Sequence, residues 1–448
     1  MLVLQPQRGG GEQGLTGEYV PALRKEGGHA AFPRARNLAG MTESEGVTDA
    51  ALADPPLPST TVVGEGSNAG RIWFPQLLRA VACMVVLLEH LGNGYPRALQ
   101  DAAKFAHYNA PTAKIIHTPW FAIGKLTDSP NFSLGFMAVA SFFLVSGFVI
   151  PFSLRQSSVA EFTAKRVFRL YPTLAACALA TVFVSWLQAI FEGVAQPYSV
   201  KSVLMTVTLS ASFQHMQFVD PVAWTLVVEE MFYVTAAVIV WRKFYGRRLP
   251  LVVIGLAFLA IASIPATPSS GLYMLSFYAA FVPFVFVGTA IHHVFVREWE
   301  LRDGLLVGGA LFGCFTASMY LSGNNYQASS YVRSSVAAIV VFLALAWVGP
   351  RLRYSPLLDQ FSKITYPLYL LHFMNGVILL NWFATKHVSF LVALPITIAI
   401  AIAGAVAVHL VIEEPAVKVG RRIARTVRSR RAARAAAALD VAAESASV

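Results

Sequence analysis

Apolar runs of membrane-spanning length constrain this chain more than any other feature of its sequence. Each run holds about 20 residues with almost no charge, enough for a helix to cross the ~30 Å hydrocarbon core of a bilayer. Because lipid offers the backbone no hydrogen-bond partner, a continuously apolar span has to be helical. The sequence therefore predicts an all-α integral membrane protein, a bundle of about ten transmembrane helices. The runs cover approximately residues 72–91, 133–154, 170–191, 222–241, 249–267, 271–295, 303–321, 331–348, 361–383 and 389–412.

The basic residues are divided unevenly between the connections. Connections that follow even-numbered spans, together with the C-terminal tail, hold 21 Lys and Arg, whereas the alternate connections hold 6. Cytoplasmic connections of multi-pass proteins carry this excess, so the bias predicts an even number of spans with both termini cytoplasmic. The same placement accounts for the net charge of +11 without nucleic acid as a partner.

Composition supports a membrane protein and argues against a soluble domain and against a disulfide or metal framework. Charged residues make up 13% of the chain, against roughly 25% in soluble domains. Cys83, Cys177 and Cys314 all fall in apolar runs and form no CxxC pair, so they are interpreted as small buried residues rather than a disulfide or zinc framework. His292 and His293 are adjacent and point about 100° apart on a helix, so no metal site is expected.

Three regions follow from these patterns. Residues 1–70 are rich in Gly, Pro, Ala, Glu and Thr and are expected to form a disordered cytoplasmic segment. Residues 71–415 form the transmembrane domain, and residues 416–448 a basic cytoplasmic tail that is expected to meet anionic lipid headgroups. The long outer loop 92–132 is either a lid or a simple tether, and the short apolar segment 200–214 is either re-entrant or interfacial.

The first span contains two ionisable residues. Placing such residues in the hydrocarbon core costs free energy, which suggests that they have a function. Arg79 and His90 are eleven residues apart, almost three helical turns, so they share a face at a separation of roughly 16 Å along the axis. An imidazole suits general base catalysis near neutral pH, and a guanidinium suits a phosphate or carboxylate. The alternative is that Arg79 extends to the cytoplasmic surface while His90 sits at the outer interface.

Further polar residues lie in or beside other spans. Glu229 and Glu230 are adjacent carboxylates in an apolar run, and Glu229 is a candidate to orient His90 or to stabilise its protonated form. Arg166 and Arg169 share one face at a helix start and are able to grip a polyphosphate, although such clusters are commonly plain topology signals. Weaker features are Ser146-Gly147, which is typical of helix packing, Tyr233 one turn beyond Glu229, and His372, which alone is typical of a packing histidine.

These pieces together resemble the membrane-bound acyltransferase-3 family of bacterial O-acyltransferases, and they occur in that family's order across residues 72–415. Thr225 and Thr365 stand where the family usually has Ser, and the chain resembles the stand-alone form without a fused hydrolase-like domain. The matching pieces are Arg79 and His90 separated by ten residues, Phe142-Phe143-x-x-Ser146-Gly147-Phe148, Arg166-x-x-Arg169 before Tyr171-Pro172, Trp224-Thr225-Leu226-x-x-Glu229-x-x-Phe232-Tyr233, Tyr366-x-Leu368-Tyr369-Leu370-x-His372, and Glu413-x-Pro415.

The resemblance implies a multi-pass enzyme of the bacterial inner (plasma) membrane. It would move an acyl group, acetyl being the commonest in the family, from acyl-CoA to a hydroxyl of a glycan, a glycolipid or a small glycosylated metabolite. It implies no bound cofactor, with acyl-CoA as the donor substrate. The residues expected to be catalytic are His90 and Glu229, and those expected to bind substrate are Arg79, Arg166, Arg169, Ser146, Trp224, Tyr233 and His372.

Other functions remain open at this stage. Helices with buried charges also suit a transporter or flippase for a lipid or glycan, although no inverted repeat is visible. A scaffold or sensor whose charges only lock helices together is a third interpretation. Dependence on acyl-CoA distinguishes the acyltransferase interpretation from the transporter interpretation. Within the enzyme interpretation, direct transfer is expected over an acyl-enzyme, because no cysteine is an obvious nucleophile.

Overall fold

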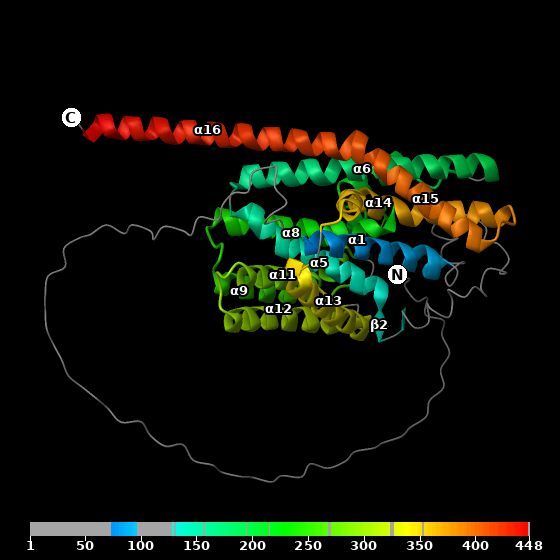
Figure 1. The fold of residues 1–448 in the computed structure, drawn as a ribbon, viewed down its shortest axis with the longest axis horizontal. Helices are drawn as coiled ribbons and strands as arrows, with labels where there is room; N and C mark the ends of the chain where they lie inside the picture. The colour runs from blue at the N-terminus through cyan, green and yellow to red at the C-terminus, as the bar shows by residue number, and fades with distance from the viewer. Residues whose placement is uncertain are drawn as a thin grey trace, which may run out of the picture. The chain divides into compact units, whose positions relative to one another are not determined.

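The computed structural model describes residues 73–95, 128–129, 131–155, 157–193, 195–214, 216–267, 270–322, 327–351 and 354–446. Apart from one short hairpin, the ordered elements in these ranges are helices, which confirms the all-α prediction (Figure 1). The predicted disordered segment 1–70 and most of the predicted outer loop 92–132 lie outside the described residues.

The elements run as follows along the chain. The α-helices are α1 (Phe74–Leu87), α5 (Leu134–Leu154), α6 (Val159–Glu192), α7 (Val200–Val207), α8 (Trp224–Trp241), α9 (Arg248–Ala262), α10 (Gly271–Ala279), α11 (Val282–Phe295), α12 (Leu301–Leu321), α13 (Ala328–Val348), α14 (Pro356–Thr385), α15 (Phe390–Val408) and α16 (Glu414–Ala446). Two π-helical segments, η1 (Leu88–Gly94) and η7 (His409–Glu413), continue α1 and α15, and short 3₁₀ turns are η3 (Ser212–Gln214), η4 (Pro221–Ala223) and η6 (Gly349–Arg351). Strands β1 (Asp128–Ser129) and β2 (Phe132–Ser133) pair antiparallel, with Asp128 opposite Ser133.

Nine helical segments within the described ranges are long and apolar enough to cross a membrane. They correspond to nine of the ten predicted runs, and the remaining run is α9, a shorter apolar helix of 15 residues. Helices α6 and α14 begin earlier than their runs predict because polar turns precede the apolar stretch. The hydroxyls of Ser158 and Ser355 cap these early starts by accepting hydrogen bonds from Glu161 N and Leu358 N.

The arginine-rich connections meet at one end of the bundle. Arg155, after α5, pairs with Glu298 at 2.9 Å, and Arg248, at the start of α9, pairs with Asp303 at 2.6 Å. The indole of Trp299 donates to the carbonyl of Gly246 at 2.9 Å, which joins the same connections again. This is the clustering that the alternating charge bias requires, so we refer below to this end as the basic end.

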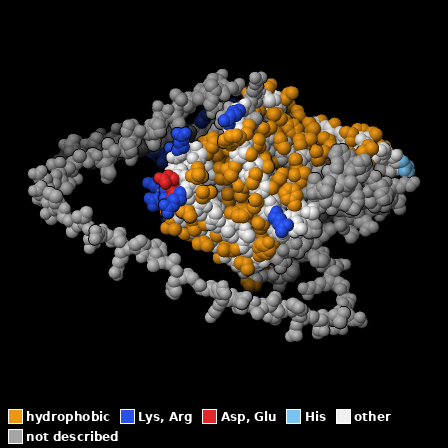
Figure 2. All heavy atoms as spheres, turned by 60° about the horizontal axis from the view of Figure 1, so that its bottom comes forward, with side chains coloured by type: hydrophobic (Ala, Val, Ile, Leu, Met, Phe, Trp, Pro, Cys, Tyr) orange, Lys and Arg blue, Asp and Glu red, His pale blue; other side chains and the backbone are white. Residues whose placement is uncertain are grey.

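Helix α5 packs against α1, α11 and α13, and its crossing with α11 is unusually close. A Cβ on Gly147 would overlap the carbonyl oxygen of Val285, and one on Gly288 would overlap that of Leu144. The two glycines therefore allow backbone-to-backbone contact, as the Ser-Gly pattern predicts. Figure 2 shows one face of the molecule covered by hydrophobic side chains. Large exposed apolar residues on α12 and α13 supply a lipid-facing surface of this kind, namely Leu301, Leu305, Leu306, Leu321, Val336, Val340, Leu343 and Trp347.

Segment 200–214 contains α7, which at 8 residues is too short to cross a bilayer. Val200 and Leu204 are exposed on it, whereas Thr206 is buried and its hydroxyl accepts a hydrogen bond from Val219 N at 2.9 Å. The segment is therefore a short surface helix tied to the chain that leads into α8.

Candidate active site

His90 lies in a π-helical segment rather than in a regular α-helix. Helix α1 is regular from Phe74 to Leu87, and η1 then runs from Leu88 to Gly94. A π-helix closes its hydrogen bonds over one more residue than an α-helix, so the phase that links Arg79 to His90 holds only as far as Leu87. Such bulges occur frequently at functional sites. The bulge redirects the His90 side chain, and the apolar pattern of this span does not indicate it.

The partner of His90 is His372 of α14. The Nδ1 atom of His90 lies 2.8 Å from Nε2 of His372, and the two ring planes differ by 3°. Nδ1 of His372 lies 2.8 Å from the carbonyl oxygen of Tyr369. A carbonyl only accepts, so His372 donates from Nδ1 and accepts at Nε2. His90 must then carry its proton on Nδ1, which leaves a lone pair on its Nε2.

The Nε2 atom of His90 makes no hydrogen bond with any residue that the structure describes. Its ring is partly buried and packs on the ring of Phe373, with centroids 4.8 Å apart. The side chain is thus held by one hydrogen bond and one aromatic contact, with its basic nitrogen unused. This is the arrangement that proton abstraction from a bound hydroxyl requires.

His90 is deeper in the bundle than its place in the sequence indicates. It lies only four residues before the end of η1, which would place it near the end of the span. His372, however, lies in the interior of α14, 13 residues or roughly 20 Å before the end of that helix. Because the two imidazoles are in contact, His90 reaches into the protein rather than to the surface.

Asp220 anchors the start of the Trp224 motif to α14, and sequence reasoning missed it. Its carboxylate is buried and accepts hydrogen bonds from Met374 N and Val222 N, both at 3.1 Å. Burial raises the pKa of Asp220 to about 7, against the opposing effect of these two N–H donors. Nearby, the hydroxyls of Thr225 and Tyr369 lie 3.1 Å apart. An Asp before Pro at a helix start was the available signal.

Glu229 belongs to a different cluster from His90. Its carboxylate accepts hydrogen bonds from the hydroxyls of Ser146, at 3.2 Å, and of Tyr233. Arg79 is within electrostatic reach of Arg169, Glu229 and Glu413. The expectation that Glu229 orients His90 is therefore not met: the orienting group is His372. The physical reason is that Glu229 compensates arginine charge at the level of Arg79, which precedes His90 by three turns.

We call Arg79, Arg169, Glu229, Tyr233 and Glu413 the arginine cluster. Tyr233 is within reach of the charges of Glu229 and Arg169. Glu413 is also bonded to His409 at 2.7 Å, so this carboxylate is shared with the π-helical segment η7. Arg79 thus lies within electrostatic reach of a second guanidinium group, of two carboxylates and of a phenol. Such a site neutralises an anionic ligand group while keeping its own charges compensated.

Arg166 lies beside this cluster, in an open cleft between α6 and α8. Its guanidinium carbon is 5.5 Å from the ring centroids of both Phe162 and Tyr233, and its Nε is buried without a hydrogen-bond partner. The cleft has a volume of about 280 Å³, and Glu230 and Thr163 also line it. Of the predicted arginine pair, Arg169 therefore lies within electrostatic reach of Arg79, and Arg166 lines the open cleft between α6 and α8.

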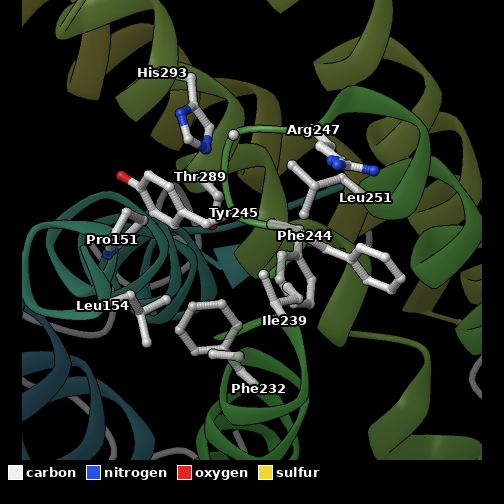
Figure 3. A pocket seen from close by; sticks show the side chains of 13 residues that line it. Pro151, Leu154, Phe232, Ile239, Phe244, Tyr245, Arg247, Leu251, Thr289 and His293 are labelled. Atoms are coloured by element: carbon white, nitrogen blue, oxygen red, sulfur yellow. The ribbon is translucent and has the colours of Figure 1, made fainter. Parts of the chain in front are cut away.

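Trp224 and a second histidine pair lie in packing environments. The ring of Trp224 packs tilted against Phe281, with centroids 5.2 Å apart, and edge-on against Phe277 at 5.9 Å. His292 is bonded to the carbonyl of Phe148 at 2.9 Å, and His293 to Glu298 at 2.7 Å. The hollow beside His293, shown in Figure 3, measures about 20 Å³, room for little more than one water molecule. Among the described residues, no three His, Cys, Asp or Glu side chains are grouped so as to hold a metal ion.

The fold and the site together define a polytopic membrane enzyme, with a fixed imidazole and an arginine cluster inside one helical bundle. The sequence profile of the acyltransferase domain family known as acyltransferase-3 matches residues 72–411, so the chain belongs to that family and is an acyltransferase. An O-acetyl transferase of Shigella phage Sf6 is 24% identical over 273 residues, which cover 58% of this chain and 78% of that protein. No solved structure matches the chain.

Proposed function

We propose that this membrane O-acyltransferase moves an acyl group, acetyl in the first instance, from acyl-CoA to a hydroxyl of a glycan, glycolipid or glycosylated metabolite, with His90 as general base. The observation that carries the proposal is the pairing of His90 Nδ1 with His372 Nε2 at 2.8 Å. This bond leaves the other nitrogen of His90 basic and unoccupied. The phage relative, named an O-acetyl transferase, supports acetyl as the transferred group.

The chemistry proceeds by direct transfer. The acceptor oxygen attacks the thioester carbonyl as Nε2 of His90 takes the hydroxyl proton. The tetrahedral intermediate then expels the CoA thiolate, which leaves as the free thiol with the proton returned from His90. The cysteines are poor nucleophiles for an acyl-enzyme, because all three are buried and the thiols of Cys83 and Cys177 face the backbone carbonyls of Thr365 and Pro367.

The arginine cluster receives the donor. Arg79 and Arg169 offer planar N–H groups that pair with phosphate or with a developing oxyanion. The cluster lies on the basic-end side of His90, because Arg79 precedes His90 by eleven residues in a helix that starts at that end. On the positive-inside rule that end is cytoplasmic, where acyl-CoA is found. We accordingly propose the bacterial inner membrane as the location, with the acceptor approaching His90 from the opposite side.

The test uses the full chain, purified in lipid nanodiscs. Acetyl-CoA is the donor, and cell-envelope glycans are the acceptors. Release of CoA thiol and mass spectrometry of the glycans are followed together. His90→Asn preserves a donor at the Nδ1 position and removes the base, so we expect turnover to fall by 10²-fold or more. His387→Asn is the matched control, at an exposed histidine whose backbone φ of 56° asparagine accepts, and it should leave turnover unchanged.

Two results would count against the proposal. Normal turnover by His90→Asn would remove the base assignment. Passage of glycan or lipid across the membrane without acetyl-CoA, and without thiol release, would instead favour a transporter or flippase.

A further inference from the structure

Two contacts tie the start of α8, and the turn before it, to the part of α14 that carries His372. Oδ2 of Asp220 accepts a hydrogen bond from the backbone N–H of Met374, at 3.1 Å. The hydroxyl of Thr225 lies 3.1 Å from that of Tyr369. Met374 follows His372 by two residues and Tyr369 precedes it by three, so the two contacts fall on either side of the imidazole. The start of α8 therefore holds the α14 backbone at the position of His372.

Asp220 uses both oxygens of its carboxylate in this arrangement. Oδ1 accepts from the N–H of Val222 at 3.1 Å, which caps the 3₁₀ turn η4, and Oδ2 accepts from the N–H of Met374. The side chain is 5% exposed, so both bonds are shielded from water. Hydrogen bonds from an N–H group to an ionised carboxylate are roughly twice as strong as neutral ones. One short side chain thus fixes the position of η4 relative to α14.

Helix α14 is weakened just before His372, so its position there depends on contacts from outside the helix. Pro367 lies five residues before His372, inside the helix, and a proline lacks the N–H that would bond to the preceding turn. The carbonyl of Tyr369, which accepts from Nδ1 of His372 at 2.8 Å, belongs to the same stretch. A shift of this backbone would move the ring together with the carbonyl that selects its tautomer, and the 2.8 Å bond to His90 would weaken.

We propose that Asp220 is a positioning residue for the acyl transfer: by holding the backbone of Met374, it keeps Nε2 of His372 at hydrogen-bond distance from Nδ1 of His90. The inference rests on the proposed function, since it concerns the base of the same reaction. Within the part of the chain that the structure describes, the side chain of Asp220 bonds to backbone N–H groups and to neither imidazole. Its effect on catalysis therefore passes through His372, and it should disappear when His372 is replaced.

The variant Asp220→Asn separates the anchor from the cap. Its amide oxygen still accepts from the N–H of Val222, but its NH₂ group then faces the N–H of Met374, and two donors cannot bond. We expect kcat for thiol release from acetyl-CoA with cell-envelope glycans to fall by roughly 10- to 100-fold, and the KM for acetyl-CoA to change by less than about twofold. The control Asp359→Asn removes another buried carboxylate from α14, 13 residues before His372, and should leave kcat unchanged.

A double-mutant cycle with His372→Phe tests the route by which Asp220 acts. In the His372→Phe background the bond to His90 is already lost, so adding Asp220→Asn should lower kcat no further. A general structural role would lower kcat by the same factor in both backgrounds. If Asp220→Asn does not fold, Asp220→Ser takes its place in the cycle. A serine hydroxyl also caps a helical turn, but it lacks the second oxygen that reaches Met374.

Three results would overturn the inference while leaving the proposed function intact. The first is an unchanged kcat in Asp220→Asn, or in Asp220→Ser, when His90→Asn is inactive. The second is an equal loss of kcat from the Asp220 variant in both backgrounds of the cycle. The third is an equal loss of kcat in the control Asp359→Asn, which would mean that any buried carboxylate of this region has the same effect. Normal turnover by His90→Asn would instead remove the base assignment, and the inference with it.

Discussion

Nδ1 of His90 and Nε2 of His372 lie 2.8 Å apart, joining residues 282 positions apart in the chain. The bond is one link in a series that ends at the carbonyl of Tyr369, 2.8 Å from Nδ1 of His372. A backbone carbonyl in α14 thus selects the tautomer of His372, which in turn selects that of His90.

Substitutions of His372 should separate positioning from packing. Gln keeps an acceptor where Nε2 stands, whereas Phe keeps the ring shape and removes it. We expect His372→Phe to lower kcat by about 10²-fold or more with little change in the KM for acetyl-CoA, and His372→Gln to recover much of the loss. Steady-state kinetics on both variants decide the matter. Equal damage from Gln and Phe would mean that His372 acts only through packing.

His372→Glu should move the pH profile. A carboxylate bonded to Nδ1–H stabilises the protonated form of His90, so activity should be lost at higher pH than in the unaltered protein. Glu229→Gln should leave this acid limb where it is, because Glu229 bonds to Ser146 and Tyr233 rather than to His90. We expect Glu229→Gln instead to lower the free energy of unfolding by about 2 kcal/mol, since it leaves arginine charge uncompensated. The measurement is the profile of kcat/KM against pH for both variants. A shift of the acid limb of this profile in Glu229→Gln would support the sequence-based prediction that Glu229 orients His90.

Asp220 should make stability depend on pH. Burial raises the pKa of this carboxyl from 3.8 to about 7, so between these values the folded protein holds a proton that the unfolded chain has released. Stability contributed by this group is therefore present below about pH 4 and is lost as pH rises toward 7. Thermal unfolding midpoints from pH 4.5 to 7.5 should fall less steeply with pH in Asp220→Asn than in the unaltered protein. Parallel curves would show that Asp220 titrates normally.

The close crossing of α5 and α11 should not tolerate a methyl group. Gly147→Ala places a Cβ against the carbonyl of Val285, and we expect a loss of about 1–3 kcal/mol in the free energy of unfolding. Gly313→Ala is the matched control in α12, where nothing lies within 4 Å of the added Cβ, and it should be neutral or slightly stabilising. Equilibrium unfolding in mixed micelles measures the free energy of unfolding of both variants. Equal changes in the two variants would contradict the close contact between α5 and α11.

Much of the fold and part of the site were accessible from local pattern alone. Hydropathy located nine spans and the shorter α9, and the motif order indicated the acyltransferase family that the profile match confirms. The same local reasoning paired His90 with Glu229, because both are ionisable groups in apolar runs and such groups require a polar partner in the membrane. Spacing along one helix fixes which face a side chain shares, but it carries no information about the neighbour on another helix.

The sequence by itself determined that this chain is a polytopic helical membrane protein, because the free energy of placing a residue in lipid depends on that residue and its immediate neighbours. Only the tertiary structure decided which polar groups meet. His90 was joined to His372, Glu229 to Ser146 and Tyr233, and Arg428 to Glu161 by helix crossings whose geometry depends on close packing across the whole bundle. The π-helical turn at Leu88–Gly94 belongs with these, since the contacts around it and not its own composition set where His90 points.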